Sequence, residues 1–350
     1  MDPPGPTRAT ARERHSFPAV IGIGASAGGV TALQRLARLL PAGLPAPVLV
    51  VQHIGPYPSV LPQLLTAAGP LPAQHAVGGE TPRPGRVYVA PPDRHMIVED
   101  GVLRCVHGPK EHHTRPAIDP LFRSMALAYG PRAIGVILTG WGEDGTPGLQ
   151  AVSACGGTVL VQDPAEAQQA NMPMSALRYV DVDGTFRIAE LPQMLTALLS
   201  RVPPELAIAR PRLALEEEQA IFMSQGNPME HLDKVGAPSA YVCPDCNGGL
   251  WEVAASRPRR FRCHTGHAFT LRTLQEAQSG ATDMAMWNAM RGLEEKEMLL
   301  RDVAQQCLEE GASEEAARMQ MLAHAVAGHA AALRELIERE APRAAAAGIG

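Results

Sequence analysis

The chain has 350 residues, of which 45% are hydrophobic and 19% are charged, a composition that excludes a disordered or collagen-like protein. Its 31 basic and 36 acidic residues leave a formal net charge of −5, which argues against binding of nucleic acid. The sequence has no apolar run of the roughly 18 residues that cross a membrane, and Arg8, Arg12 and Arg14 precede no hydrophobic stretch of the signal-peptide type. We therefore expect a cytoplasmic protein that does not insert into membranes.

Strands and helices are predicted to alternate up to about residue 200. Residues 19–23 and 48–52 are short apolar runs typical of buried strands, and Val30, Leu33 and Leu36 between them recur at helical spacing. The further predicted strands are 87–90, 95–98, 102–106, 133–138 and 158–161, and the further predicted helices are 56–68, 147–154 and 192–200. This alternation predicts an α/β fold with a doubly wound, mostly parallel sheet.

The last part of the chain has a different organisation. A Pro-rich stretch begins at residue 201, and two amphipathic patterns separated by Gly311 indicate a helical hairpin near the end. We predict six segments: a disordered N-terminal arm (1–17), an α/β domain (18–200), a linker with a short acidic helix from Glu216 (201–238), a cysteine-containing module (239–270), a helical hairpin (271–340) and a tail (341–350).

The first predicted site is the glycine-rich turn that follows the first strand, with the sequence Gly24-Ala-Ser26-Ala-Gly28. A phosphate-binding loop is one interpretation, but residues 40–55 contain no carboxylate that would hold a ribose. A nucleophile elbow is the other interpretation, because small residues on both sides of a serine let it sit on a tight strand-to-helix turn. We favour the elbow.

Two further residues of hydrolytic type end predicted strands. His53 follows the second strand and Asp144 lies just past a later one, at the edge of a parallel sheet where ligands collect. In the resulting triad, His53 takes the proton of Ser26 and Asp144 fixes the imidazole. Backbone N–H groups near Ala27 and Trp141 are the predicted oxyanion donors. The simpler interpretations are that Ser26 and Asp144 cap helices and that His53 is a histidine at a sheet end.

Five ordered blocks of sequence resemble the catalytic domain of the CheB-type chemotaxis protein-glutamate methylesterases. They begin at Ile21, Val51, Tyr88, Arg115 and Leu138 and read IGIGASAGG, VQH, YVAPP, RPAIDPLF and LTGWGEDG. The resemblance covers roughly residues 18–200 and implies a serine hydrolase with Ser26, His53 and Asp144 as catalytic residues and no cofactor for catalysis. It also implies hydrolysis of glutamate γ-methyl esters on chemoreceptor signalling helices, with glutamine deamidation as a related activity.

The sequence departs from the family pattern in two residues and in its organisation. Ala27 stands where the family usually has threonine, and Trp141 stands where it usually has methionine. Family members commonly carry an N-terminal receiver domain, whereas about 17 residues precede the first predicted strand, so we expect regulation by a separate protein or none. Two other functions remain as alternatives: a non-catalytic receptor-binding scaffold of a chemosensory complex, and an esterase for a small-molecule ester.

The Arg115 block contains polar residues without a predicted catalytic role. Arg115 is a candidate for holding a receptor carboxylate, and the alternative is that Pro116 and Asp119 mark the start of a helix. His112 and His113, just before this block, are expected in a solvated loop.

The second predicted site is a group of metal ligands with the spacing C-x₂-C-x₁₆-C-x₃-H, formed by Cys243, Cys246, Cys263 and His267. Four protein ligands leave no open position, so we predict structural zinc outside the hydrolytic centre. His264 is the alternative fourth ligand. The blocks Leu250-Trp-Glu, Arg260-Phe-Arg-Cys263 and Gly266-His267 also resemble the zinc-ribbon tails of some stand-alone members of the same family, and we expect a small zinc ribbon in residues 239–270.

Overall fold

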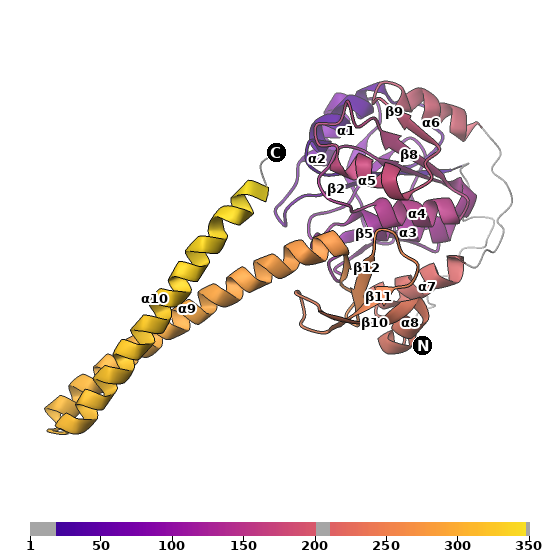
Figure 1. Cartoon of the computed structure of the whole chain (residues 1–350). Helices are drawn as coiled ribbons and strands as arrows, with labels where there is room; N and C mark the ends of the chain where they lie inside the picture. Colours follow the sequence, from indigo (N-terminus) through magenta and orange to yellow (C-terminus); the bar gives the residue numbers. More distant parts are fainter. Residues whose placement is uncertain (1–18, 201–210, 348–350) are drawn as a thin grey trace, which may run out of the picture. The chain divides into compact units, whose positions relative to one another are not determined.

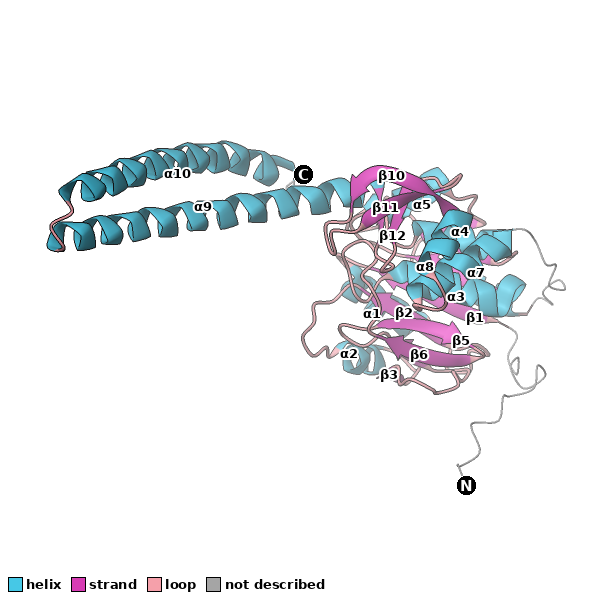
Figure 2. Cartoon of the chain, turned by 90° about the horizontal axis from the view of Figure 1, so that it is seen from below, coloured by secondary structure: helices cyan, strands magenta, loops and turns pink. Residues whose placement is uncertain are grey.

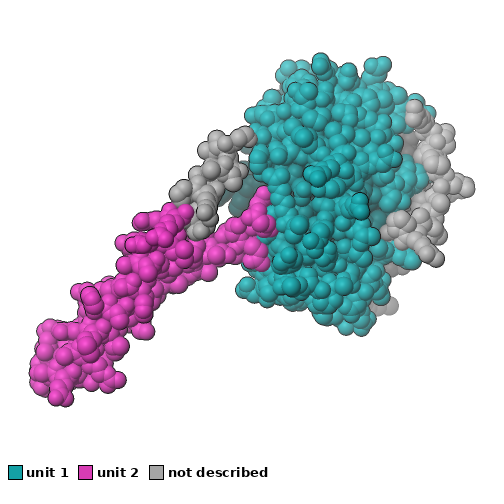
Figure 3. Space-filling model, in the orientation of Figure 1, with its two compact units in different colours: residues 1–274 teal, residues 275–350 magenta. Residues whose placement is uncertain are grey.

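The structure is a computed structural model that describes residues 19–200 and 211–347. The predicted N-terminal arm (1–17) lies outside the described residues. The chain divides into two compact units, residues 1–274 and residues 275–350 (Figure 3). Among the described residues, no helix combines the length and the apolarity needed to cross a membrane.

A parallel sheet forms the centre of the first unit. Its strands are β1 (Val20–Ala25), β2 (Val48–Gln52), β3 (Ala73–His75), β4 (Val87–Val89), β7 (Ala133–Ile137), β8 (Thr158–Gln162) and β9 (Gly184–Phe186). Their order in the sheet is β3-β4-β2-β1-β7-β8-β9, and every pairing is parallel. The first strand therefore lies in the middle and the chain winds outward to both sides, which confirms the predicted doubly wound fold.

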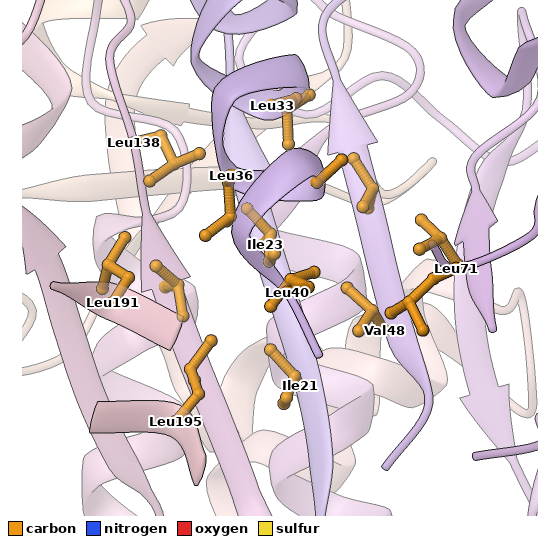
Figure 4. Close-up of a cluster of buried hydrophobic side chains, with 14 of the residues drawn as sticks. Ile21, Ile23, Leu33, Leu36, Leu40, Val48, Leu71, Leu138, Leu191 and Leu195 are labelled. Atoms are coloured by element: carbon orange, nitrogen blue, oxygen red, sulfur yellow. The ribbon is translucent and has the colours of Figure 1, made fainter. Parts of the chain in front are cut away.

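Helices cover both faces of this sheet. They are α1 (Gly29–Leu39), α2 (Leu61–Ala68), α3 (Ile118–Tyr129), α4 (Thr146–Ala154), α5 (Asn171–Tyr179) and α6 (Leu191–Leu199). Ile21 packs with Leu33 and Leu36 of α1 in one buried cluster (Figure 4), whereas the neighbouring Val20 belongs to a second cluster together with Phe122 of α3. Because both faces are covered, β1 is buried along its whole length and its sequence is a continuous run of apolar and small residues.

A separate two-stranded hairpin precedes α3, as the sequence predicts. It consists of β5 (His95–Glu99) and β6 (Val102–Val106), paired antiparallel. Its turn places Asp100 at φ 51° and Gly101 at φ 79°, the left-handed conformation that tight hairpin turns require. The hairpin is attached to α3 because the N–H of Val98 donates a hydrogen bond to Ser124 Oγ at 3.0 Å. A 3₁₀ turn, η2 (Gly130–Arg132), then leads into β7.

Residues 211–274 form a C-terminal module within the first unit. It contains the helices α7 (Pro211–Phe222) and α8 (Pro228–Val235) and an antiparallel sheet of β10 (Gly236–Val242), β11 (Gly249–Val253), β12 (Arg260–Cys263) and β13 (Ala268–Thr270) (Figure 2). Helix α7 begins before the predicted start at Glu216, since proline is well tolerated in the first turn of a helix. The predicted segment boundary at residue 239 falls inside β10.

Two long helices end the chain, α9 (Leu271–Glu309) and α10 (Ser313–Ala347), which run alongside each other in opposite directions (Figures 1 and 2). This confirms the predicted helical hairpin, although α10 continues past its predicted end at residue 340. Met290 of α9 and Ile337 of α10 belong to one buried cluster, and Arg334 donates a hydrogen bond to Glu294 at 2.5 Å. Gly311 in the connection has φ 79°, which glycine adopts without strain.

Candidate active site

Three neighbouring strands of the sheet bring the predicted catalytic residues together. Ser26 follows β1, His53 follows β2, and Asp144 lies in the loop after β7, and these strands are adjacent in the order β2-β1-β7. Backbone hydrogen bonds extend the strand pairing to the site, from the N–H of Ser26 to the carbonyl of Thr139 at 3.0 Å and from the N–H of His53 to the carbonyl of Ala25 at 3.0 Å. The carboxyl end of the sheet therefore places all three residues side by side.

The side chains of these residues form a hydrogen-bonded series. His53 Nδ1 lies 3.1 Å from Ser26 Oγ, and His53 Nε2 lies 2.7 Å from Asp144 Oδ2. The Asp144 side chain is 2% exposed, whereas that of His53 is 15% exposed, so the carboxylate is buried behind the ring. With Nε2 donating its proton to Asp144, Nδ1 is free to accept the hydroxyl proton of Ser26.

Backbone N–H groups hold the Asp144 carboxylate in place. Ile118 donates to Oδ2 at 2.7 Å and Asp119 donates to Oδ1 at 3.0 Å, both from the first turn of α3. Burial by itself raises the pKa of Asp144, but the hydrogen bond from His53, the charge of His112 and the N–H of Ile118 lower the pKa below its ordinary value. Asp144 is therefore held as a carboxylate.

Neither Ser26 nor Asp144 caps the helix that directly follows it in the chain. The N-cap of α1 is Gly28, and within the described residues no side chain caps that position. At the start of α4, it is Asp119 Oδ1 that accepts from the N–H groups of Gly145 at 3.0 Å and Gly148 at 2.6 Å. The two carboxylates thus bind the first turns of each other's helices, Asp144 at α3 and Asp119 at α4.

Two glycines give the serine its position. Gly28 has φ 77°, a conformation that side-chain-bearing residues rarely adopt, and it ends the turn between Ser26 and α1. At Gly140, a Cβ atom would lie 2.8 Å from the Cβ of Ser26, so a larger residue would displace the serine. The Gln52 amide adds support that sequence reasoning missed, because it donates to the carbonyl of Ser26 at 2.8 Å and to that of His53 at 3.1 Å.

The two residues predicted near the oxyanion site lie beside the serine and are exposed. Ala27 is in the turn that precedes α1, and its carbonyl accepts a hydrogen bond from Thr139 Oγ1 at 3.0 Å. Trp141, which follows Gly140, is 38% exposed. The guanidinium of Arg272 lies 5.8 Å from the centre of a Trp141 ring, a cation–π contact with the C-terminal module.

The Arg115 block has a structural place next to the site. Arg115 Nε donates to Asp93 at 2.8 Å and Nη1 donates to the carbonyl of Gly108 at 2.8 Å. Helix α3 begins at Ile118, close to the predicted helix start. The expectation that His112 lies in a solvated loop is wrong, because its side chain is 4% exposed and contacts Asp119, whereas His113 is 59% exposed.

The predicted metal ligands converge in the C-terminal module and form a group that could hold a metal ion: Cys243, Cys246, Cys263 and His267, with all ligand atoms within 4.8 Å of one another. The sulfur atoms of Cys246 and Cys263 are 3.7 Å apart, and His267 Nδ1 lies 3.7 Å from the sulfur of Cys243. A tetrahedral zinc site with Zn–S bonds of about 2.3 Å has sulfur atoms about 3.8 Å apart, so the spacing fits that ion. His264 is exposed and outside the group, whereas His267 belongs to it.

The charges in this group already favour a thiolate. The hydrogen bond from Cys243 lowers the pKa of the Cys263 thiol to about 3, and hydrogen bonds with His267 and Thr265 act in the same direction. Burial lowers the pKa of His267, but its hydrogen bonds with Cys263 and Cys246 raise that pKa to about 9. Thr265 Oγ1 lies 2.9 Å from the sulfur of Cys263 and 3.1 Å from His267 Nδ1, so its hydroxyl contacts two of these side chains.

A serine, a histidine and a buried aspartate at adjacent strand ends of a doubly wound sheet are the arrangement of a serine hydrolase. The family model of the CheB methylesterases matches residues 21–195, half of the chain, and the chain belongs to this family. It is 41% identical over 182 residues to protein-glutamate methylesterase/protein-glutamine glutaminase 1 of Paramagnetospirillum magneticum, covering 50% of this chain and 48% of that protein. It is 42% identical over 172 residues to protein-glutamate methylesterase/protein-glutamine glutaminase 4 of Myxococcus xanthus, covering 49% of this chain and 49% of that protein.

The solved catalytic domain of the Thermotoga maritima CheB methylesterase has the same fold. The similarity has a TM-score of 0.50 at 34% sequence identity and covers 51% of this chain and 98% of that structure. The chain spans about half the length of the curated relatives that it matches. The similarity to these proteins therefore concerns the α/β domain of this chain.

Proposed function

We propose that the chain is a protein-glutamate methylesterase that hydrolyses glutamate γ-methyl esters on the signalling helices of chemoreceptors. The observation that carries this proposal is the hydrogen-bonded series from Ser26 through His53 to Asp144 within a CheB methylesterase domain. The names of the relatives from Paramagnetospirillum magneticum and Myxococcus xanthus support this substrate class.

In the first half of the proposed reaction, Ser26 Oγ attacks the γ-carbonyl carbon of the methyl ester. His53 Nδ1 takes the hydroxyl proton, and its Nε2–H remains donated to Asp144, whose negative charge stabilises the imidazolium. The tetrahedral intermediate then breaks its bond to the methoxy oxygen. Methanol leaves with the proton from His53, and a glutamyl ester of Ser26 remains.

In the second half, water attacks the ester carbon of this acyl-enzyme. His53 takes a proton from the water and returns it to Ser26 Oγ as the ester bond breaks, which releases a glutamate carboxylate. The same sequence of steps deamidates a glutamine when ammonia replaces methanol as the leaving group. Backbone N–H groups near Ala27 and Trp141 stabilise the oxyanion, and the positive end of α1 next to Ala27 favours a negative charge there.

We further propose that the C-terminal module holds one structural zinc ion on Cys243, Cys246, Cys263 and His267. The ion would tie the turn after β10 to the end of β12. The proposal is supported by the fit of the sulfur spacing to a tetrahedron and by the complete set of four protein ligands. The module then contributes to folding and leaves the hydrolytic chemistry to the α/β domain.

Two alternatives make different predictions. A receptor-binding scaffold does not need a reactive serine, so it would not form an adduct at Ser26 with a serine-directed phosphonate. An esterase for a small-molecule ester would hydrolyse simple esters in preference to a methylated receptor. The hydrogen bonds of His53 with Ser26 and Asp144 favour the enzyme, because a scaffold gains nothing from an aligned proton acceptor.

The experiment that tests the proposal is methanol release from a methylated receptor signalling fragment by the full chain and by Ser26→Ala. We expect the wild-type protein to release methanol and Ser26→Ala to lose several orders of magnitude in rate. Ser200→Ala is the matched control, because Ser200 is an exposed serine at the end of α6 that donates to the carbonyl of Ala197 in its own turn. Equal rates for Ser26→Ala and the wild type would contradict the proposal.

A further inference from the structure

The segment between β6 and α3 contains a buried histidine that the reaction above does not use. His112 is 7% exposed, although it belongs to a connection and not to a strand or a helix. His112 has φ 51° and His113 has φ 63°, so two consecutive residues with side chains adopt the left-handed conformation. For residues with side chains this conformation is uncommon, and it persists where the surrounding structure holds it.

His112 lies between two buried carboxylates. Its Nε2 is 2.6 Å from Asp119 Oδ2 and 3.8 Å from Asp144 Oδ1. Burial lowers the pKa of His112, but the hydrogen bond to Asp119 and the charges of Asp119, Asp144 and Glu111 raise this pKa to about 9. The protonated form of His112 is therefore favoured, and it offsets negative charge where burial and the charge of Asp144 raise the pKa of Asp119 above its ordinary value.

These three side chains are close enough together for a metal site, but N–H groups already engage the carboxylate oxygens. Asp144 accepts from the N–H groups of Ile118 and Asp119, and Asp119 Oδ1 accepts from two N–H groups of α4. A bound cation would have to displace these donors. We therefore interpret His112 as the cation that faces the two carboxyl groups in place of a metal ion.

The C-terminal module holds His112 in this position. The N–H of His112 donates to the carbonyl of Ala268 at 2.8 Å, and its Nδ1 lies 3.4 Å from Thr273 Oγ1. With Nε2 directed at Asp119, the imidazole contacts the α/β domain on one side and the module on the other. These contacts account for the left-handed backbone, since the segment must turn sharply to pair with Ala268.

The residues on both sides of His112 are tied to the same module. The buried carboxylate of Glu111 accepts from Arg123 of α3 at 2.7 Å and from Arg262 of β12 at 3.0 Å. His113 Nδ1 lies 3.1 Å from Asp245, which stands between Cys243 and Cys246. The chain around His112 is thereby fixed at three successive positions.

We propose that His112 is a positioning residue of the esterase: held by Ala268 and Thr273 of the C-terminal module, it fixes the Asp144 carboxylate against His53, so that the module is part of the active site. This inference rests on the proposed function. Loss of the imidazolium leaves two carboxylates facing each other in a buried place, and Asp144 would then move from His53 or take up a proton. Either change weakens the proton acceptor that Ser26 requires.

The test compares the full chain with His112→Leu, His112→Gln and the control His231→Ala. Leucine removes the donor and the charge, whereas the glutamine amide nitrogen reaches the place of Nε2. His231 also forms a His–carboxylate pair, with Glu217, but it lies in α8 and contacts no residue of the triad. We would measure kcat and KM for methanol release, and the rate at which a serine-directed phosphonate labels Ser26.

We expect His112→Leu to lower kcat about 10- to 100-fold, because a displacement of about 1 Å at the reacting groups costs that much. Its KM should stay within about twofold of the wild-type value, since His112 is buried away from the surface that a receptor reaches, and phosphonate labelling should slow in parallel. His112→Gln should recover part of the loss, and His231→Ala should match the wild type. If His112→Leu does not fold, a lower kcat at unchanged KM in His112→Gln supports the same conclusion.

Two results would overturn the inference, and they are distinguishable. If the wild type releases methanol and the folded His112 variants keep its kcat, or change only KM, His112 does not position the triad and the proposed function stands. If the wild type neither releases methanol nor reacts with the phosphonate, the proposed function and the inference fail together.

Discussion

Replacement of Arg262 by methionine tests how the C-terminal module is held on the α/β domain. Arg262 is 1% exposed and donates to Gly266 at 2.9 Å, Glu111 at 3.0 Å and Glu218 at 3.3 Å. Removal of one partner from a buried ion pair costs about 3–5 kcal/mol, because it leaves a charge without compensation. Glu111 keeps Arg123 at 2.7 Å, and Glu218 keeps another arginine at 2.8 Å, so we expect a loss of about 3 kcal/mol, at the lower end of that range.

Thermal unfolding of the full chain measures this loss. In a protein of this size, 1 kcal/mol corresponds to a change of about 2–4 °C in Tm, so Arg262→Met should unfold about 6–12 °C below the wild type. Arg259→Met is the control, since Arg259 forms two hydrogen bonds with Glu252 at the surface and should give no measurable change. Equal Tm values for the two variants would refute the reasoning that the buried charges hold the module.

Three further predictions concern the triad, the buried charges and the metal ligands. Asp144→Asn should lower kcat for methanol release by about 10⁴-fold and should also lower Tm, because the amide nitrogen cannot accept an N–H group of α3; a loss of kcat below about tenfold would contradict the role of Asp144. Glu218 has its pKa lowered to about 2 from 4.5, so it stabilises the fold above pH 4.5, and up to about 3 kcal/mol is lost as the pH falls to about 2. The free energy of unfolding of Glu218→Gln should therefore change less between pH 6 and about 2.5 than that of the wild type, and equal slopes would contradict this assignment. Metal analysis of the folded protein should find one zinc per chain in the wild type and a loss of zinc in Cys246→Ser, whereas retention of zinc in this variant would exclude Cys246 as a ligand.

The fold and the triad were accessible from the sequence because local signals determine them. The apolar runs at β1, β2 and β7 are long enough to identify buried strands, and a parallel sheet places the residues after Gln52 and Ala25 at the same edge. The spacing of Cys243 and Cys246 likewise predicted a metal-binding turn, since close ligand pairs need no knowledge of the rest of the chain.

The surroundings of the triad were not accessible, because they depend on contacts between distant segments. From the sequence, His112 is expected in an exposed loop, because its contacts with Ala268 and Thr273 form only in the folded chain. Asp119 and Asp144 each lie near the start of a helix. The sequence does not show that Asp119 accepts hydrogen bonds at the start of α4 and that Asp144 accepts them at the start of α3. Glu111 and Arg262 form a buried ion pair although 151 residues separate them in the sequence. A charged residue without a nearby partner in the sequence is expected to be exposed.

The most direct measurement of the central claim is the mass of the full chain and of its peptides after reaction with a serine-directed phosphonate. We predict one adduct per chain, located on Ser26, with no adduct in Ser26→Ala and a much slower reaction in His53→Ala. An unlabelled wild-type protein, or an adduct on another serine that persists in Ser26→Ala, would contradict the assignment of Ser26 as the nucleophile of a methylesterase.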